Sequence, residues 1–198
     1  FCLNRLMRIL LIDGENFKYK ANEALKELGK SEPDWTLYNF SGLFQKVLNG
    51  IKFDEKRFYY ARLKMHPDTK EKSQKLIDGQ RALLLNIRKQ GFMPCSSGSV
   101  RGRYEKGAKN QKEILVFREK GVDVAMAVDM VLGACDGIIQ EMYLCSSDSD
   151  LQPAIRALRN KKVKVAYIGF QTNPNIGMQK TTHESFLIRS SEVSEFVK

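Results

Sequence analysis

Short apolar runs alternate along the chain with longer stretches in which apolar residues recur every three or four positions. The runs Arg8–Ile12, Ile138–Cys145 and Val163–Gly169 are typical of strands that are buried on both faces of a sheet. The longer stretches have the period of amphipathic helices, and Gly91 after the longest of them is a typical helix stop. This alternation predicts an α/β fold with a mostly parallel central sheet.

The remaining strands and helices are predicted from the same two patterns, short apolar runs for strands and the three-to-four-residue repeat for helices. Further strands are predicted at Arg57–Met65, Phe92–Val100 and Glu113–Arg118. Helices are predicted at Phe17–Leu28, after Pro33 (with Leu37, Phe40, Phe44, Val47 and Leu48), and at Thr69–Gln90, Val122–Ala134 and Leu151–Asn160. Within Thr69–Gln90 we expect Leu76, Ile77, Leu83, Leu84 and Ile87 to face inward. Residues 101–112 are expected to form the loop of a hairpin, and 184–198 a short strand and a short helix.

No repeat or linker rich in Pro or Ser divides the chain, so residues 7–198 are expected to form one domain. Residues 1–6 are expected to be a tag remnant or a disordered N-terminal extension. The sequence has 198 residues, 42% of them hydrophobic, which is enough for a sizeable core. No apolar run approaches the roughly 20 residues of a membrane helix, so no membrane association is expected.

The cysteines argue against a zinc site. Cys2, Cys95, Cys135 and Cys145 are scattered without a paired spacing, so we expect free thiols in a reducing cytoplasm. The charge is more informative, because 33 Lys and Arg against 23 Asp and Glu give a formal net charge of +10. This excess predicts attraction to polyanions, with nucleic acid first among them.

Acidic residues follow predicted strands at the edge where open α/β sheets bind ligands. Asp13 follows the first strand, Asp148 and Asp150 follow the strand that ends at Cys145, and Asp123 opens a helix. If the strands ending at 12 and 145 are neighbours, these four carboxylates converge. Converging carboxylates repel one another unless a cation neutralises them, and a site of oxygen ligands favours Mg²⁺ or Mn²⁺.

Each acid also has a purely structural interpretation. Asp13 and Asp150 are typical turn formers or helix N-caps, and Asp123 can belong to the first turn of its helix. Asn16 is either the N-cap of the first helix or a side chain that orients Asp13. Glu15 is expected to be a first-turn acid, and Asp129 lies about 600° around the helix from Asp123 and should face away.

Three segments resemble the motifs of NYN-domain proteins, which belong to the PIN-like nuclease group. They are Leu11-Ile12-Asp13-Gly14-Glu15-Asn16, KGVDVAMAVDM at 120–130 and SSDSD at 146–150. They occur in the family's order over roughly 7–170, and the second is the most specific. The resemblance implies a Rossmann-like (PIN-like) three-layer sandwich and a divalent-metal ribonuclease site. Asp13, Asp123, Asp148 and Asp150 would be metal-site carboxylates, and Asn16 would orient Asp13. Many relatives have Gly where Ser147 stands, which bears on the fit of Asp150.

The expected function is therefore metal-dependent hydrolysis of phosphodiester bonds in RNA, single-stranded RNA being favoured. Two alternatives stay open: a non-catalytic RNA-binding or scaffold module of the same fold, and phosphoryl transfer with Asp13 as nucleophile. The usual pattern for that transfer has Asp at the position of Glu15. His66 and His183 lie outside the motifs and are expected to take no part.

The segment 101–112 joins basic and aromatic residues on a Gly-containing loop, a composition suited to single-stranded nucleic acid. Its alternative role is a solvated hairpin whose charges only aid solubility. The expected nucleic-acid-binding residues are Arg101, Arg103, Tyr104, Lys106, Lys109, Lys112 and Lys120. Lys161, Lys162 and Lys164 follow a helix and are assigned a structural role. The strand 138–145 and the tail 184–198 are candidate surfaces for a homodimer.

Overall fold

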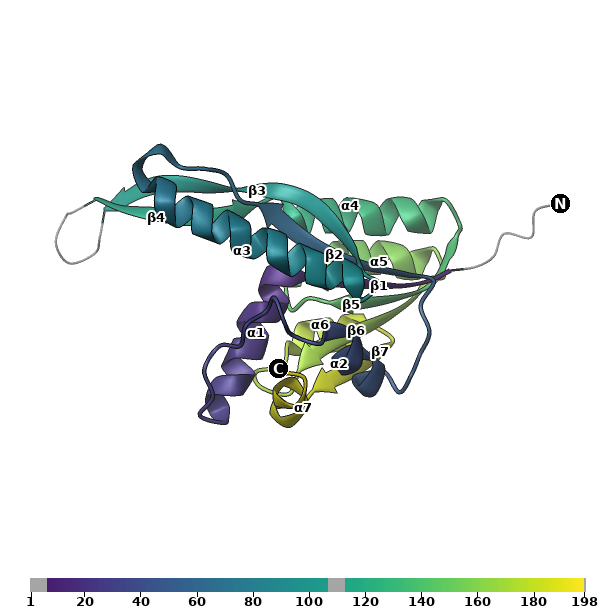
Figure 1. Cartoon of the computed structure of the whole chain (residues 1–198). Coiled ribbons are helices and arrows are strands. Elements are labelled where there is room, and N and C mark those ends of the chain that lie inside the picture. The colour runs from purple at the N-terminus through teal and green to yellow at the C-terminus, as the bar shows by residue number, and fades with distance from the viewer. Residues whose placement is uncertain (1–6, 107–112, 198) are drawn as a thin grey trace.

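A seven-stranded sheet forms the middle layer of the computed structural model, with helices on both of its faces (Figure 1). The structure describes residues 7–106 and 113–197. The strands are β1 (Met7–Asp13), β2 (Glu55–Arg62), β3 (Met93–Lys106), β4 (Glu113–Lys120), β5 (Ile139–Cys145), β6 (Lys164–Phe170) and β7 (Glu184–Ile188). Their order in the sheet is β4-β3-β2-β1-β5-β6-β7, and every pair is parallel except β3 with β4. The predicted α/β sandwich with a mostly parallel sheet is confirmed.

The outer layers consist of seven helices and two short 3₁₀ turns among the described residues. The helices are α1 (Gly14–Glu27), α2 (Phe40–Val47), α3 (Lys70–Lys89), α4 (Val122–Cys135), α5 (Gln152–Asn160), α6 (Ile176–Thr181) and α7 (Ser190–Glu195). The 3₁₀ turns are Pro67–Thr69 and Ser149–Leu151. Helix α6 was not predicted, since a six-residue helix carries too little of the 3.6-residue period.

Alternation along β1 builds the two halves of the core. Leu10 and Ile12 pack with α1, α2 and the C-terminal half of α3, whereas Ile9 and Leu11 pack with α4 and α5 on the opposite face. All four side chains are buried, as expected for a central strand that helices cover on both faces.

The second helix begins at Phe40, later than the prediction that placed its start after Pro33. Trp35 and Tyr38 reach the core from an irregular segment, and Leu37 is exposed. The Asn39 side chain accepts a hydrogen bond from the N–H of Gly42 (2.9 Å), and this cap sets the start of the helix.

The hairpin of β3 and β4 is longer than predicted. Residues 101–106 were expected in a loop, but they continue β3 and pair with β4 as far as Lys106 opposite Glu113. The reason is antiparallel pairing, which continues after the pairing of β2 with β3 ends at Arg62 and Ser99. The ribbon therefore extends beyond the sheet by seven residues, roughly 23 Å at the usual rise of a strand. We call this ribbon, together with the N-terminal half of α3 beside it, the arm (Figure 1).

The arm changes the burial of α3. Leu83 and Ile87 are buried as predicted, and Ile77 and Leu84 are partly buried, but Leu76 is 48% exposed and the prediction for it was wrong. The N-terminal half of α3 lies beside the ribbon, beyond the end of β1 and its core, so nothing covers Leu76 fully.

Three other expectations bear on the described residues. Cys95, Cys135 and Cys145 are free thiols, as predicted, and Cys2 lies outside the described residues, as do 1–6 as a whole. Strand β5 pairs with β1 and β6, so the segment 138–145 offers no free edge to a second copy and that expectation was wrong. None of the helices in the described part of the chain is long and apolar enough to cross a membrane.

Gly14 gives the first testable prediction, because α1 begins there with no connecting residue after β1. A Cβ at Gly14 would lie 2.4 Å from the Phe58 ring and 2.8 Å from the carbonyl oxygen of Tyr59. Gly14→Ala should therefore lower the free energy of unfolding by about 1–3 kcal/mol, as measured by urea denaturation. Gly79→Ala is the matched control. It lies inside α3 with no atom within 4 Å of its Cβ position, so it should stabilise by about 0.5–1 kcal/mol. Equal effects of the two changes would contradict the packing described for Gly14.

Candidate functional site

The four acidic residues singled out above lie at the edge of the sheet where the strands end. Ile12 of β1 pairs with Cys145 of β5, so the predicted adjacency of these two strands is confirmed. The chain moves outward from β1 in both directions, which makes this edge the switch point where open α/β sheets bind ligands. Helix α4 begins at the same edge, because β4 runs back along β3 to Lys120 opposite Ser99. Gly121, with φ of 93°, makes the turn from β4 into α4.

Asp13 is the most buried of these acids, with 5% of its surface exposed. It is the N-cap of α1, and its Oδ1 accepts a hydrogen bond from the N–H of Asn16 (3.1 Å). Its Oδ2 accepts another from the Ser146 hydroxyl (3.2 Å), across 133 residues of sequence. The carboxylate is therefore fixed from both sides, by the start of α1 and by the turn after β5.

The pKa of Asp13 is raised to about 6, mainly by burial and also by the charges of Asp123 and Asp148, while the hydrogen bonds from Asn16 and Ser146 lower it. Burial also raises the pKa of Asp123, with contributions from the charges of Asp148 and Asp150. Each of the four carboxylates thus lies within electrostatic reach of at least one other, as the sequence predicted.

The turn Ser146–Asp150 has its own internal hydrogen bonds. Asp148 is the N-cap of the 3₁₀ turn, and its Oδ1 accepts a hydrogen bond from the N–H of Asp150 (2.8 Å). The N–H of Asp148 donates to the Ser146 hydroxyl (3.2 Å). Ser146 therefore connects Asp13 to Asp148, a role that the sequence analysis missed although the residue lies in the recognised motif.

Asn16 fits neither interpretation drawn from the sequence. It is not the N-cap, because Asp13 is, and its side-chain oxygen bonds to Ser147. Its backbone N–H holds Asp13, while its Oδ1 accepts a hydrogen bond from the N–H of Ser147 (2.9 Å). Asn16 thereby links the first turn of α1 to the turn after β5.

Ser147 has no left-handed backbone. Its hydroxyl lies 2.9 Å from that of Tyr167, and its carbonyl accepts a hydrogen bond from the side chain of Asn175 (2.8 Å). Sequence reasoning missed Tyr167 and Asn175 too, because no local pattern connects them to Ser147, which lies 20 and 28 residues before them.

Other polar residues lie apart from this acidic edge. Asp129 accepts a hydrogen bond from the Tyr59 hydroxyl (2.8 Å), on a different face of α4 from Asp123. Glu15 is a first-turn acid, as expected, and forms an ion pair with Lys18 (2.6 Å). His66 caps the first 3₁₀ turn, and the Nδ1 of His183 accepts a hydrogen bond from the N–H of Val165 (3.0 Å).

The donor set suits a hard divalent cation, since it consists of carboxylate oxygens and contains no thiol or imidazole. Among the described residues, however, no three carboxylate, imidazole or thiol groups already stand in the arrangement of a metal site. The carboxylates repel one another, and a divalent cation would offset this repulsion. The repulsion is therefore the feature of the site that fits a metal ion.

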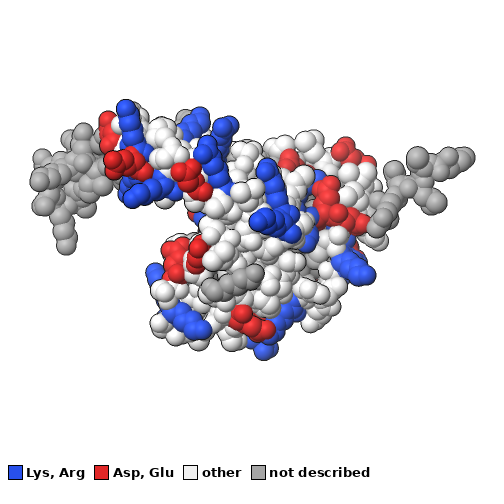
Figure 2. Space-filling model, in the orientation of Figure 1, with Lys and Arg blue, Asp and Glu red and all other residues white. Residues whose placement is uncertain are grey.

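The basic residues assigned above to nucleic-acid binding and those assigned a structural role lie in different parts of the sheet. Arg101, Arg103, Tyr104 and Lys106 belong to β3 and Lys120 ends β4, whereas Lys109 and Lys112 lie outside the described residues. Figure 2 shows Lys and Arg side chains along the arm, together with acidic ones.

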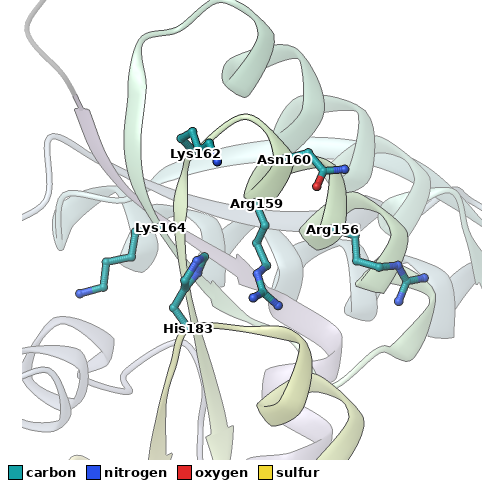
Figure 3. A pocket seen from close by; sticks show the side chains of 6 residues that line it. All are labelled: Arg156, Arg159, Asn160, Lys162, Lys164 and His183. Atoms are coloured by element: carbon teal, nitrogen blue, oxygen red, sulfur yellow. The ribbon is translucent and has the colours of Figure 1, made fainter.

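The second group lines a hollow of about 540 Å³ at the amino end of β6 (Figure 3). Its cations do not converge on one point: Lys164 and Arg156 extend in opposite directions. Lys164 pairs with Glu184 (2.7 Å), and Arg159 donates to the carbonyl of Thr181 (2.8 Å). These contacts agree with a structural role for this group.

The family model described as NYN domain matches residues 8–188, nearly the whole chain. Among curated proteins, no sequence matches. The fold is similar to a crystal structure of a protein of unknown function from Vibrio parahaemolyticus. The TM-score is 0.59 with 18% sequence identity, over 95% of this chain and 96% of that one.

The buried carboxylate of Asp13 predicts an unusual pH dependence of stability. Its pKa is about 6 in the folded state against an ordinary value of 3.8, so the folded state binds the proton more tightly. The free energy of unfolding should therefore fall as the pH rises from about 4 to about 6 and then level off. Asp13→Asn, which carries no charge, should be more stable than the wild type by roughly 3 kcal/mol at pH 7.5 and by almost nothing at pH 3.5.

Urea denaturation at both pH values measures the difference in the free energy of unfolding between Asp13→Asn and the wild type. Asp136→Asn, at an exposed position, is the control, and a gain for Asp13→Asn that is the same at both pH values would disprove the linkage.

Proposed function

The chain belongs to the NYN domain family, whose fold is nuclease-like, and from this premise we propose that it is a divalent-metal-dependent ribonuclease. One observation supports the proposal above all: carboxylates from three separate segments lie at the switch point of the sheet, each within electrostatic reach of at least one other. Capping accounts for Asp13 and Asp148, which are N-caps, but it does not account for Asp123 and Asp150, whose charges lie near them.

Asp13 and Asp148 are proposed to hold Mg²⁺ or Mn²⁺, with Asp123 and Asp150 beside them. A cation bound there would lower the pKa of a coordinated water and offset the charge of the scissile phosphate. The remaining contributions come from the chain itself. Asn16 and Ser146 fix the Asp13 carboxylate through its two oxygens, so it needs little rearrangement on binding. The hydrogen bond from Asp150 to Asp148 fixes the other proposed ligand in the same way.

The hydrogen bonds between the first turn of α1 and the turn after β5 would keep the ligands at a constant separation. Asn16 bonds to Ser147, and Asn175 bonds to the carbonyl of the same residue. We assign Asn16 and Asn175 a positioning role, since the side chains of both bond to the backbone of Ser147. No general base other than a carboxylate-held water would then be needed, which agrees with the location of both histidines elsewhere.

The substrate class is proposed to be RNA in single-stranded form. The arm extends past the edge that carries the carboxylates and includes the basic residues of β3, so a phosphate backbone that reaches the cluster would lie close to cations. The rival function is a non-catalytic RNA-binding module. It is supported by the finding that the described residues contain no formed metal site. Cleavage assays separate the two.

Two acids of α4 offer a matched test of the proposed site. Asp123 takes part in the cluster, whereas Asp129, six residues on, accepts the Tyr59 hydroxyl. Asp123→Asn should lower Mn²⁺-dependent cleavage of a fluorescent single-stranded RNA at least about 100-fold, because a proposed ligand loses its charge. Asp129→Asn should stay within about three-fold, since Asn can still accept the hydrogen bond.

Asp13→Asn should abolish cleavage and leave RNA binding intact, which a binding assay without divalent ions can measure. If Asp123→Asn and Asp129→Asn lose activity alike, the assignment of the cluster is wrong. If the wild type cleaves no RNA in Mn²⁺, the protein is the non-catalytic module instead.

The basic ribbon generates a separate prediction about affinity. Arg101→Glu with Arg103→Glu should weaken RNA binding and reduce the slope of log affinity against log salt by about 0.7 for each phosphate that the protein no longer neutralises. The rate at saturating RNA should hardly change, because these residues lie outside the carboxylate cluster. The control is Lys161→Glu with Lys180→Glu, the same charge change at exposed positions outside the arm. A solvated hairpin without a role in binding would make both double variants behave alike.

A further inference from the structure

The outward face of α4 is apolar. Val124, Val128 and Leu132 are 68%, 49% and 56% exposed, and they follow one another at intervals of four residues. We call these three residues the apolar row. On the opposite side of the helix Met126 and Met130 are buried in the core. A surface helix normally carries polar residues on its outward face, and a helix that is apolar on all sides is typical of a buried segment. The apolar row is therefore expected to be covered by another molecule.

A hollow lies beside the apolar row, between α4 and α5, which run side by side (Figure 1). Its volume is about 580 Å³, and Ala127, Val131, Pro153 and Ala154 line it together with the row. Side chains at intervals of four residues form a ridge, and such a ridge packs into a groove of a neighbouring surface. The same face of the protein thus carries a ridge and a hollow that can receive one. A two-fold contact between identical chains requires a surface that is complementary to itself in this way.

The charges around the hollow point to the same occupant. Of the described residues that line it, Asp123 and Asp150 are acidic and none is a cation, which disfavours RNA and acidic lipid. Lys120 precedes α4 and Asp136 is its C-cap, and both are exposed, so opposite charges stand beyond the two ends of the helix. An antiparallel contact would bring Lys120 of each copy to the end that carries Asp136 in the other copy.

We propose that two copies of this chain associate through the apolar row and the hollow beside it, with their α4 helices antiparallel and a two-fold axis at Val128. Val124 of each copy then meets Leu132 of the other, because Val128 is the middle of the row. The two Asp123 residues, each five positions from Val128, are about 15 Å apart along the helices, more than the Debye length of about 8 Å at physiological salt. A parallel contact would instead bring the acids of both copies together. A different protein could also cover an apolar face, but the fit of this surface to itself in shape and charge favours a second copy.

Two leucines provide a matched test of the contact. Leu132 belongs to the apolar row and is 56% exposed, whereas Leu85 is 55% exposed on α3, outside the hollow. Each is replaced with Glu in the full chain, and the mass in solution is measured by sedimentation equilibrium between about 1 and about 100 µM protein. The wild type and Leu85→Glu should reach twice the mass of one chain. Leu132→Glu should raise the dissociation constant at least about ten-fold, because the two-fold axis buries the unpaired charge twice.

Both leucines are exposed in the single chain, so neither change should unfold it. Circular dichroism and urea denaturation at low protein concentration check this. A loss of mass in Leu132→Glu with an unchanged circular dichroism spectrum then reports the contact and not a folding defect.

Cysteine cross-linking tests the antiparallel arrangement. The background replaces Cys2 and the exposed Cys135 with Ser and should form no cross-link itself. Val128→Cys in this background should form a disulfide between two copies on mild oxidation, since the two-fold axis brings the residue against itself. Val124→Cys should not, because its two copies would be about 12 Å apart along the helices, too far for a disulfide.

A wild type that is monomeric over the whole concentration range would overturn the inference, and so would equal effects of Leu132→Glu and Leu85→Glu. A cross-link through Val124→Cys but not through Val128→Cys would refute the antiparallel arrangement. None of these outcomes depends on RNA cleavage. The contact and the proposed nuclease function can therefore fail independently of each other.

Discussion

The burial of one carboxylate governs the arrangement of the whole acidic edge. Asp13 ends a strand that is covered on both faces, so water reaches little of it and its ionised form is destabilised. The fold offsets part of this cost with two hydrogen bonds and with the N-terminus of α1, whose N–H groups point at the carboxylate. Gly14 makes this possible, because only a residue without Cβ lets α1 begin against the Phe58 ring. The remaining cost is the part that a bound cation would relieve.

The same edge separates the two signs of charge. The net charge of +10 describes the protein as a whole, yet the switch point holds four acids, and burial together with the charges of their neighbours raises the pKa of two of them, Asp13 and Asp123. The basic residues of β3 and β4 belong to the arm. In the proposed function, attraction of a polyanion and neutralisation of the acidic centre would fall to different elements, so a net charge alone says little about the site.

The sequence allowed the fold class, most strands and the four acids to be predicted, because each depends on local period or on the residue that follows a strand. Asp13 and Asp148 could be placed at one edge only on the assumption that their strands are neighbours, and the pairing of Ile12 with Cys145 confirms it. Ser146, Tyr167 and Asn175 could not be assigned, since their bonds join segments that no local pattern relates. Residues 101–106 were misread as loop because Gly and charged residues have low strand propensity, which pairing with β4 overrides.

The repeat of apolar residues along α3 does not by itself show where the buried face of this helix ends. Its apolar positions recur regularly from Leu76 to Ile87, so the pattern predicts one buried face along the whole helix. The core beneath that face ends where β1 ends, at Asp13, while α3 and the ribbon continue outward. The same face is therefore core at Ile87 and an open wall at Leu76. The end of the sheet thus leaves carboxylates at the strand termini and, on α3, an apolar surface that the protein itself covers only in part.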